Sequence, residues 1–184
     1  MKYNSIQDIL NICEETEKPF WRVIMEEDMQ ESAMSETSSF EKMREMYRAM
    51  ADADRNYDAG LKSESRMTGG DGQKLHEYNE AGRNLCGNFV GLAMEKAIKM
   101  GESNACMRRI VAAPTAGACG VIPAVLLSYQ ELYHAEEDRM VEAMFTAAGI
   151  GNVIAMNAYI AGASGGIEPL FGLVFSRLIM DGTE

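Results

Sequence analysis

The chain carries AAPTAGACG at residues 112–120, and the apolar run VIPAVLL follows directly at residues 121–127. Exposed turns are usually made by Asp, Asn, Ser or Lys, which hydrogen-bond locally, whereas this stretch has one hydroxyl, on Thr115, and no charge. Gly117 and Gly120 can adopt a positive φ or let another group approach the main chain closely. The stretch therefore predicts a backbone that lies against something else, at the entrance to a buried helix.

Two interpretations of this stretch stay open. Backbone N–H groups at the entrance to a helix form an anion site, which would suit a phosphate or the carboxylate of a substrate. A tight packing loop between two helices explains the same small residues, and the spacing alone favours packing.

Composition restricts the class of protein. With 184 residues, of which 47% are hydrophobic, the chain is long enough to bury a core. A net charge of −11 argues against nucleic acid and anionic membrane surfaces as partners. Residues 1–13 lack the basic and then apolar pattern of a secretion signal, and no apolar run is long enough to span a membrane. We therefore expect a soluble, cytoplasmic, globular protein.

Apolar residues at helical spacing run through most of the chain and predict a mostly α fold. Ser38, with Glu41 three residues later, has the pattern of a capping box, and Gly101 is placed to end a helix. The nearly uncharged residues 150–166 are expected to be buried, so Asn157 near their middle needs a partner or a ligand. The expected helices cover residues 5–15, a segment from Pro19, a segment from Ser38 toward Gly60, and residues 73–81, 87–100, 121–127 and 136–150.

A second unusual loop, SRMTGGDGQK, occupies residues 65–74. Three glycines together with Thr68 and Asp71 make a polar turn, rich in donors, directly before the predicted helix 73–81. A ligand could bind here. Thr68 or Asp71 acting only as a helix cap explains the pattern equally well.

Taken together and in this order, the two loops and two later segments resemble the alpha chain of bacterial iron–sulfur L-serine dehydratases. The resemblance rests on MTGGD at residues 67–71 with Lys74, and on APTAGACGVIPA at residues 113–124. It continues with FTAAG at residues 145–149 and NAYIAGASGG at residues 157–166. Several long motifs agree in sequence and order, from the N-terminus to about residue 166.

The resemblance implies a mostly helical catalytic domain that converts L-serine to pyruvate and ammonia. In that family an oxygen-sensitive [4Fe–4S] cluster with one open iron site acts as a Lewis acid on the substrate hydroxyl, while a base removes the α-proton. Pyridoxal phosphate would not be needed. The expected partners are L-serine, a serine dehydratase beta chain and further copies of the chain.

By position, the resemblance assigns eight residues to the substrate, and the expected burial of Asn157 makes it a ninth candidate. Backbone amides and the two threonine hydroxyls would bind its carboxylate, and Asp71 would hold its ammonium group. Lys74 is a candidate base or charge partner, although a solvated helix lysine explains it as well, and the base is left unassigned. The nine residues are Thr68, Gly69, Gly70, Asp71, Pro114, Thr115, Ala116, Gly117 and Asn157.

The cysteines depart from the family pattern. In the family a cluster cysteine follows the glycine pair directly and two more lie downstream, whereas here Ile167 follows Gly166 and no cysteine comes after it. Cluster ligation needs thiolates at the metal, so we expect no cluster, and no metal ligand, in this chain. The existing cysteines show no CxxC spacing and are expected to be small packing residues: Cys13, Cys86, Cys106 and Cys119.

The end of the chain resembles something else. Residues 161–184, with GIEP at residues 166–169, are similar to a segment of adenosylcobalamin-dependent ribonucleotide reductases. We therefore expect a helical dehydratase-like domain over residues 1–166, incomplete at its C-terminal end, and a divergent tail over residues 167–184. A truncated dehydratase fused to a foreign tail would explain this change, and an error in sequence assembly could have joined the two parts. The alternative function is a non-catalytic helical domain that binds a small amino acid or a partner subunit.

Overall fold

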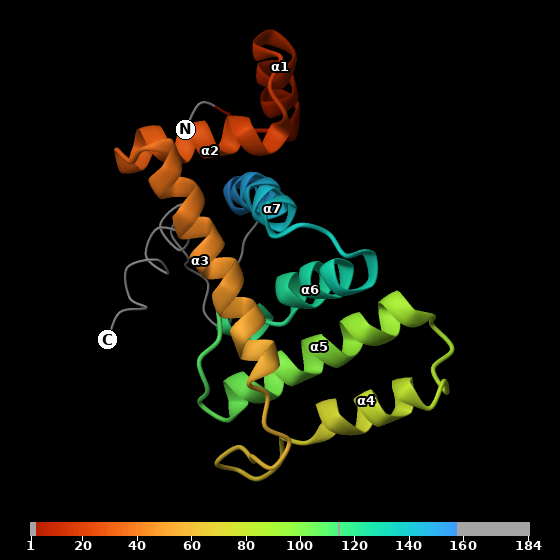
Figure 1. The fold of residues 1–184 in the computed structure, drawn as a ribbon. Coiled ribbons are helices and arrows are strands. Elements are labelled where there is room, and N and C mark those ends of the chain that lie inside the picture. The colour runs from red at the N-terminus through yellow and green to blue at the C-terminus, as the bar shows by residue number, and fades with distance from the viewer. Residues whose placement is uncertain (1–2, 114, 158–184) are drawn as a thin grey trace. The chain divides into compact units, whose positions relative to one another are not determined.

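The computed structural model describes residues 3–113 and 115–157, and the regular structure in these residues is entirely helical (Figure 1). The mostly α fold expected from apolar spacing is confirmed. The expectations for the tail, including the boundary at residue 166, fall outside the described residues and stay predictions. The elements are α1 (Ile6–Thr16), α2 (Phe20–Ser32), α3 (Glu36–Arg55), α4 (Asp71–Glu80), α5 (Asn88–Ala105), the short 3₁₀ helix η1 (Ala116–Ala118), α6 (Val121–Tyr133) and α7 (Glu137–Asn157).

The described residues divide into two compact units. One, here called the terminal unit, joins the residues up to Glu45 with those from Asp138 onward. The other, the central unit, comprises residues 46–137 and contains both glycine loops. None of the helices in the described part of the chain has the length and apolar character needed to cross a membrane.

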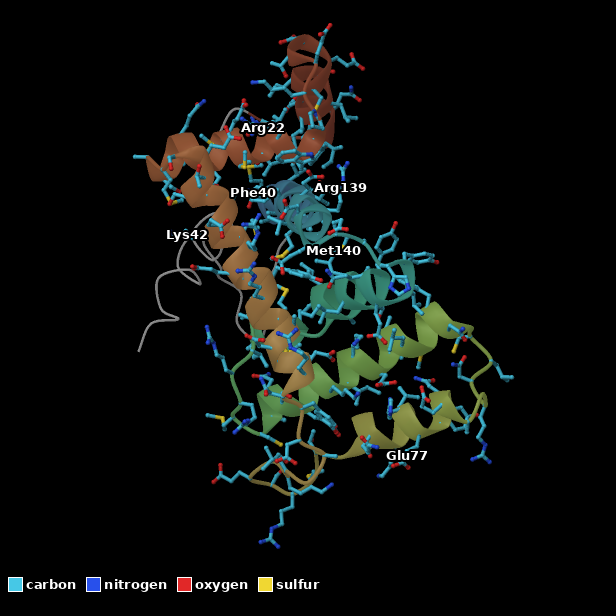
Figure 2. The ribbon with its side chains drawn as sticks, in the orientation of Figure 1. Arg22, Phe40, Lys42, Glu77, Arg139 and Met140 are labelled. Carbon is cyan, nitrogen blue, oxygen red and sulfur yellow. The ribbon has the colours of Figure 1, made fainter. Side chains whose placement is uncertain are left out.

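The terminal unit is built on α1, α2, the first turns of α3, and α7. A capping box starts α1, because the Ser5 hydroxyl accepts from the N–H of Asp8 and the Asp8 carboxylate accepts from the N–H of Ser5. The Phe40 ring on α3 stacks on Phe145 of α7 with centroids 6.2 Å apart, and Figure 2 marks Phe40 and Met140 on these two helices. The core residues include Ile9, Val23, Ile24, Met25, Met140, Val141, Met144 and Phe145.

The predicted start of α3 is wrong. The helix begins at Glu36, and the hydroxyl of Ser35 accepts from the N–H of Ser38 at 3.2 Å, so Ser38 lies inside the helix rather than at its cap. Ser39, also inside the first turn, is buried and donates to the Asp28 carboxylate at 2.8 Å.

Helix α5 is the centre of the central unit, with α4 packed on one side and α6 on the other (Figure 1). A buried lysine, Lys96, ties it to two more helices through ion pairs of 2.7 Å to Asp54 on α3 and 2.9 Å to Glu131 on α6. Burial would lower the pKa of Lys96, but the two carboxylates outweigh burial and raise it. The ammonium therefore stays charged inside the unit.

Two expectations of complete burial are wrong. Helix α6 forms as predicted, but Val121 and Val125 are exposed while Leu127 is buried, so only one face packs inward. Helix α7 continues to Asn157, and Ile150 and Ile154 on it are 41% and 52% exposed. Within the described part of residues 150–166, burial is again confined to one helical face.

Candidate functional site

The candidate site is organised by the last turn of α5. This turn lies beyond the helix end that the sequence predicted. Gly101 was expected to end this helix, but α5 continues to Ala105. A β-carbon at Gly101 would meet no atom of the described residues within 4 Å, so the glycine is an exposed position within the helix and not a cap. The additional turn carries Glu102 and Asn104, and each of these side chains binds one of the two glycine loops.

The TGGD loop, residues 68–71, is a rigid turn that needs its glycines. Gly69 and Gly70 have φ values of 133° and 83°, which L side chains rarely adopt. The Gly69 carbonyl accepts from the Lys62 ammonium, and the half-buried Thr68 exchanges hydrogen bonds with Ser63 through its carbonyl at 2.9 Å and its N–H at 3.2 Å. This turn delivers the chain directly into α4.

Glu102 occupies the N-terminal end of α4. Its carboxylate accepts from the N–H groups of Asp71 at 2.7 Å and Gly72 at 3.0 Å, and from the hydroxyl of Tyr57 at 2.5 Å. The side chain is almost completely buried. The positive end of the helix dipole and its free amides, which we expected to be open to a substrate anion, are therefore filled by a carboxylate of the chain itself.

The ionisation of this cluster follows from its contacts. Burial would raise the pKa of Glu102, but the hydrogen bonds from Tyr57, Asp71 and Gly72 outweigh burial and lower it. The pKa of Tyr57 is raised to about 12 by burial and by its bond to the Glu102 carboxylate. At neutral pH the pair is a carboxylate and a neutral phenol.

Asp71 and Lys74 form an exposed ion pair on the first turn of α4, with 2.7 Å between Oδ1 and Nζ. The hydrogen bond between them lowers the pKa of Asp71 and raises the pKa of Lys74. Because its pKa is raised, Lys74 stays protonated at neutral pH and cannot accept a proton. Of the two roles considered for it, charge partner therefore fits better than base. Glu77 lies on the outer side of the same helix, directed away from α5 (Figure 2).

The PTAG loop, residues 114–117, is described from Thr115 onward, and Pro114 lies outside the described residues. The Thr115 hydroxyl caps η1 by accepting from the N–H of Ala118 at 3.3 Å. The Ala116 carbonyl accepts from the side-chain amide of Asn104 at 3.1 Å. Thr115, Ala116 and Gly117 are all exposed.

The two loops therefore come to the same end of α5, but on different faces of it. Residues two apart on a helix do not face the same way, so Glu102 and Asn104 reach opposite sides of the turn. Glu102 lies on the α4 side and Asn104 on the η1 side. Asn157, the remaining predicted ligand, ends α7 in the terminal unit, and its side chain lies outside the described ones.

A shallow surface hollow, without enclosed volume, lies beside the TGGD loop. Gly69, Glu102 and Tyr57 form part of its wall, and Arg108 contributes a cation. The hollow thus combines a buried carboxylate with an exposed guanidinium next to the predicted substrate loop.

Sequence reasoning missed Tyr57, Glu102 and Asn104. One signal for Glu102 was available, because a carboxylate in the last turn of a helix opposes the helix dipole and indicates a compensating partner. The erroneous helix end at Gly101 hid this signal. Nothing local marked Tyr57, whose partner is 45 residues away in the chain.

The described cysteines do not fit an iron–sulfur cluster. Cys13 lies on α1 in the terminal unit, Cys86 is exposed between α4 and α5, and Cys119 is buried with its sulfur 3.9 Å from the Met100 carbonyl. Across residues 3–113 and 115–157, no three His, Cys, Asp or Glu side chains come together in a way that could hold a metal ion.

Comparison with known proteins identifies relatives of the chain. The family model described as "Serine dehydratase alpha chain" matches residues 15–172. The L-serine dehydratase alpha chain of Peptoniphilus asaccharolyticus is 32% identical over 166 residues, which are 90% of this chain and 57% of that protein. The probable L-serine dehydratase alpha chain of Bacillus subtilis is 31% identical over 170 residues, which are 92% of this chain and 57% of that protein.

Another relative matches a shorter part of the chain at higher sequence identity. L-serine dehydratase TdcG of Escherichia coli is 42% identical over 89 residues, which are 48% of this chain and 20% of that protein. The chain thus spans little more than half the length of the two alpha chains that it matches. No solved structure shows a significant match to it.

Proposed function

This chain belongs to the serine dehydratase alpha chain family, and we propose that it binds the amino acid in an enzyme that converts L-serine to pyruvate and ammonia. The two alpha chains that it matches are named for L-serine dehydratase activity. For this chain, the observation that carries the proposal is the attachment of both the TGGD loop and the PTAG loop to one turn of α5, through Glu102 and Asn104. Both loops lie at the same end of α5, on opposite faces of its last turn, and we assign the amino acid to this end of the helix.

The groups that remain free in the two loops suit the two charges of an amino acid. The Thr115 oxygen already accepts from Ala118, which leaves its O–H to donate to a carboxylate. Among the described residues, the Thr115 hydroxyl, at 3.8 Å, is the one group within 4 Å of a β-carbon position at Gly117, which leaves room for the ligand that we propose. The exposed Asp71 carboxylate is available to an ammonium group in exchange for Lys74.

Glu102 changes one detail of the expected binding mode. The N–H groups of Asp71 and Gly72 already donate to its carboxylate, so they are not free for the substrate. We assign to the TGGD loop the Thr68 hydroxyl and the Asp71 carboxylate, with Gly69 and Gly70 shaping the turn. The carboxylate of the substrate is assigned to the PTAG loop, where Pro114, Ala116 and Gly117 accompany Thr115.

The family uses an iron–sulfur cluster as a Lewis acid on the substrate hydroxyl, but the described cysteines of this chain are too scattered to hold one. We assign to this chain the binding and orientation of the amino acid. We propose a beta chain as a partner, because the matched relatives are named alpha chains, together with further copies of this chain and a cytoplasmic location.

The scattered cysteines favour a second candidate, a domain that binds a small amino acid or a partner subunit without catalysis. Pyruvate production separates the two. The chain would be supplied with iron and sulfide without air, and assayed with L-serine alone and with a beta chain. We expect pyruvate when a second polypeptide supplies cluster ligands. Slower amide exchange in both loops on addition of L-serine, without pyruvate in any mixture, would favour the binding domain.

Substitutions of Thr115 provide the residue-level test. Thr115→Ala removes the hydroxyl and should weaken L-serine binding about tenfold, since a hydrogen bond to a charged group is lost. Thr115→Ser keeps the hydroxyl and should bind nearly as well as the wild type. Equal binding by all three proteins would contradict the assignment of Thr115 to the substrate.

A further inference from the structure

Glu102 is a buried carboxylate in a position that a carboxylate normally avoids. It lies in the last turn of α5, where the helix dipole is negative, and only 4% of the residue is exposed. Three donors compensate for this, two of them main-chain amides at the first turn of α4. The arrangement joins the negative end of one helix to the positive end of another through a single side chain.

The surroundings leave little freedom to this junction. A β-carbon at Gly72 would lie 2.6 Å from Lys99 Cγ and 3.2 Å from the Tyr57 ring, so α4 approaches α5 as closely as its backbone permits. On the other side of the loop, Lys62 holds the Gly69 carbonyl. The TGGD loop is thus anchored at both ends, by Lys62 before the glycine pair and by Glu102 after it.

We propose that Glu102 is a positioning residue for the amino-acid site, which fixes the first turn of α4 and thereby places Thr68 and Asp71 for the ligand. This inference rests on the proposed function, because that function assigns Thr68 and Asp71 to the substrate. Glu102 itself does not touch the substrate. Both its oxygens are already engaged by Tyr57 and by the amides of Asp71 and Gly72.

The chain offers a matched control on the same helix. Glu95 lies two turns earlier on the same face of α5, is 3% exposed, and also binds α4, through His76 at 3.0 Å and Asn79 at 3.1 Å. Its contacts are to the middle and end of α4, away from the TGGD loop. Loss of Glu95 therefore weakens the packing of α4 without releasing the amides of Asp71 and Gly72.

Three variants of the chain test the proposal: Glu102→Gln, Glu102→Asp and Glu95→Gln. Glu102→Gln keeps one acceptor oxygen and turns an NH₂ group toward the amides, whereas Glu102→Asp keeps the carboxylate. NMR measures the amide exchange of Asp71 and Gly72. Titration gives the dissociation constant for L-serine, and thermal unfolding gives the stability of each variant.

We expect Glu102→Gln to speed exchange of these two amides and to weaken L-serine binding, each about tenfold, with partial recovery in Glu102→Asp. Glu95→Gln should lower the melting temperature but leave both quantities near their wild-type values. If Glu95→Gln weakens binding as much as Glu102→Gln, or if Glu102→Gln leaves the two amides protected, the positioning role is refuted.

The two proposals fail in different ways. A wild-type chain that does not respond to L-serine contradicts the proposed function. Amide exchange in the variants requires no ligand, so it still decides whether Glu102 fixes the first turn of α4.

Discussion

Gly120 lies so close to α5 that a β-carbon on it would be 2.7 Å from the carbonyl oxygen of Ala97. The neighbouring atoms belong to backbone, which cannot rotate away as a side chain can. The packing interpretation of the glycine-rich stretch therefore accounts for Gly120. It does not account for Gly117, three residues earlier, because among the described residues the Thr115 hydroxyl at 3.8 Å is the one group near its β-carbon position. Packing therefore explains one glycine of the motif, and the other is the one to which we assign the proposed ligand contact.

Gly120→Ala should destabilise the central unit by about 1 to 3 kcal/mol, because α6 must move away from α5 to admit the methyl group. Gly101→Ala is the matched control on α5. In the described part of the chain no atom lies within 4 Å of its β-carbon position, so this variant should gain about 0.5 to 1 kcal/mol from helix propensity. Urea unfolding measures both. A Gly120→Ala variant as stable as the wild type would exclude the close approach described above.

Acid should destabilise the chain partly through Glu102. Its pKa is lower in the folded chain than the ordinary value of 4.5, so its stabilising contribution is complete above that pH and is lost as the pH falls through the folded value. The free energy of unfolding should therefore fall below about pH 4.5, and less steeply in Glu102→Gln. Urea titrations between pH 6 and 3, a range set by this ionisation, check the prediction. An identical slope in wild type and variant would contradict it.

Lys96 should contribute stability with the opposite pH dependence. Its pKa is raised above the ordinary 10.5, so the contribution is present below that value and is lost as the pH rises through the folded value. Lys96→Met leaves the Asp54 carboxylate without its cation, and one oxygen of that carboxylate is already buried without a hydrogen bond in the described residues. We expect a loss of about 3 to 5 kcal/mol in urea unfolding.

Lys74→Met provides the comparison for Lys96. Lys74 also pairs with an aspartate at 2.7 Å, but both side chains are exposed. Solvent screens such a pair, so the substitution should change stability little. If both lysine variants behaved alike, burial would not be the property that distinguishes them.

The cysteines should react with thiol reagents in the order of their exposure. Cys86 is exposed and should be alkylated first in the native chain. Cys119 is buried, and burial raises the pKa of its thiol, so it should react only when the chain unfolds. Mass spectrometry after timed alkylation, with and without urea, measures this order. Rapid labelling of Cys119 in the native chain would show that its packing against α5 opens readily.

Local patterns were read correctly where the residue type alone carries the information. Gly69 and Gly70 signalled a turn, and both adopt the positive φ that glycine permits. Two local signals were misread. Helix α3 begins at Glu36, with the Ser35 hydroxyl rather than that of Ser38 at its first turn, and α5 continues past Gly101 to Ala105.

The amino-acid sequence was sufficient to predict a helical fold and two glycine loops, because apolar periodicity and glycine-rich turns are local properties of the chain. The order of its motifs indicated the family by resemblance, and the comparisons confirm that family. Tertiary packing decided which groups of those loops remain free. Glu102 reaches its amide partners across about 30 residues of sequence, and that contact occupies the amides at the start of α4. No local pattern shows such a contact, since it exists only when α5 packs against α4.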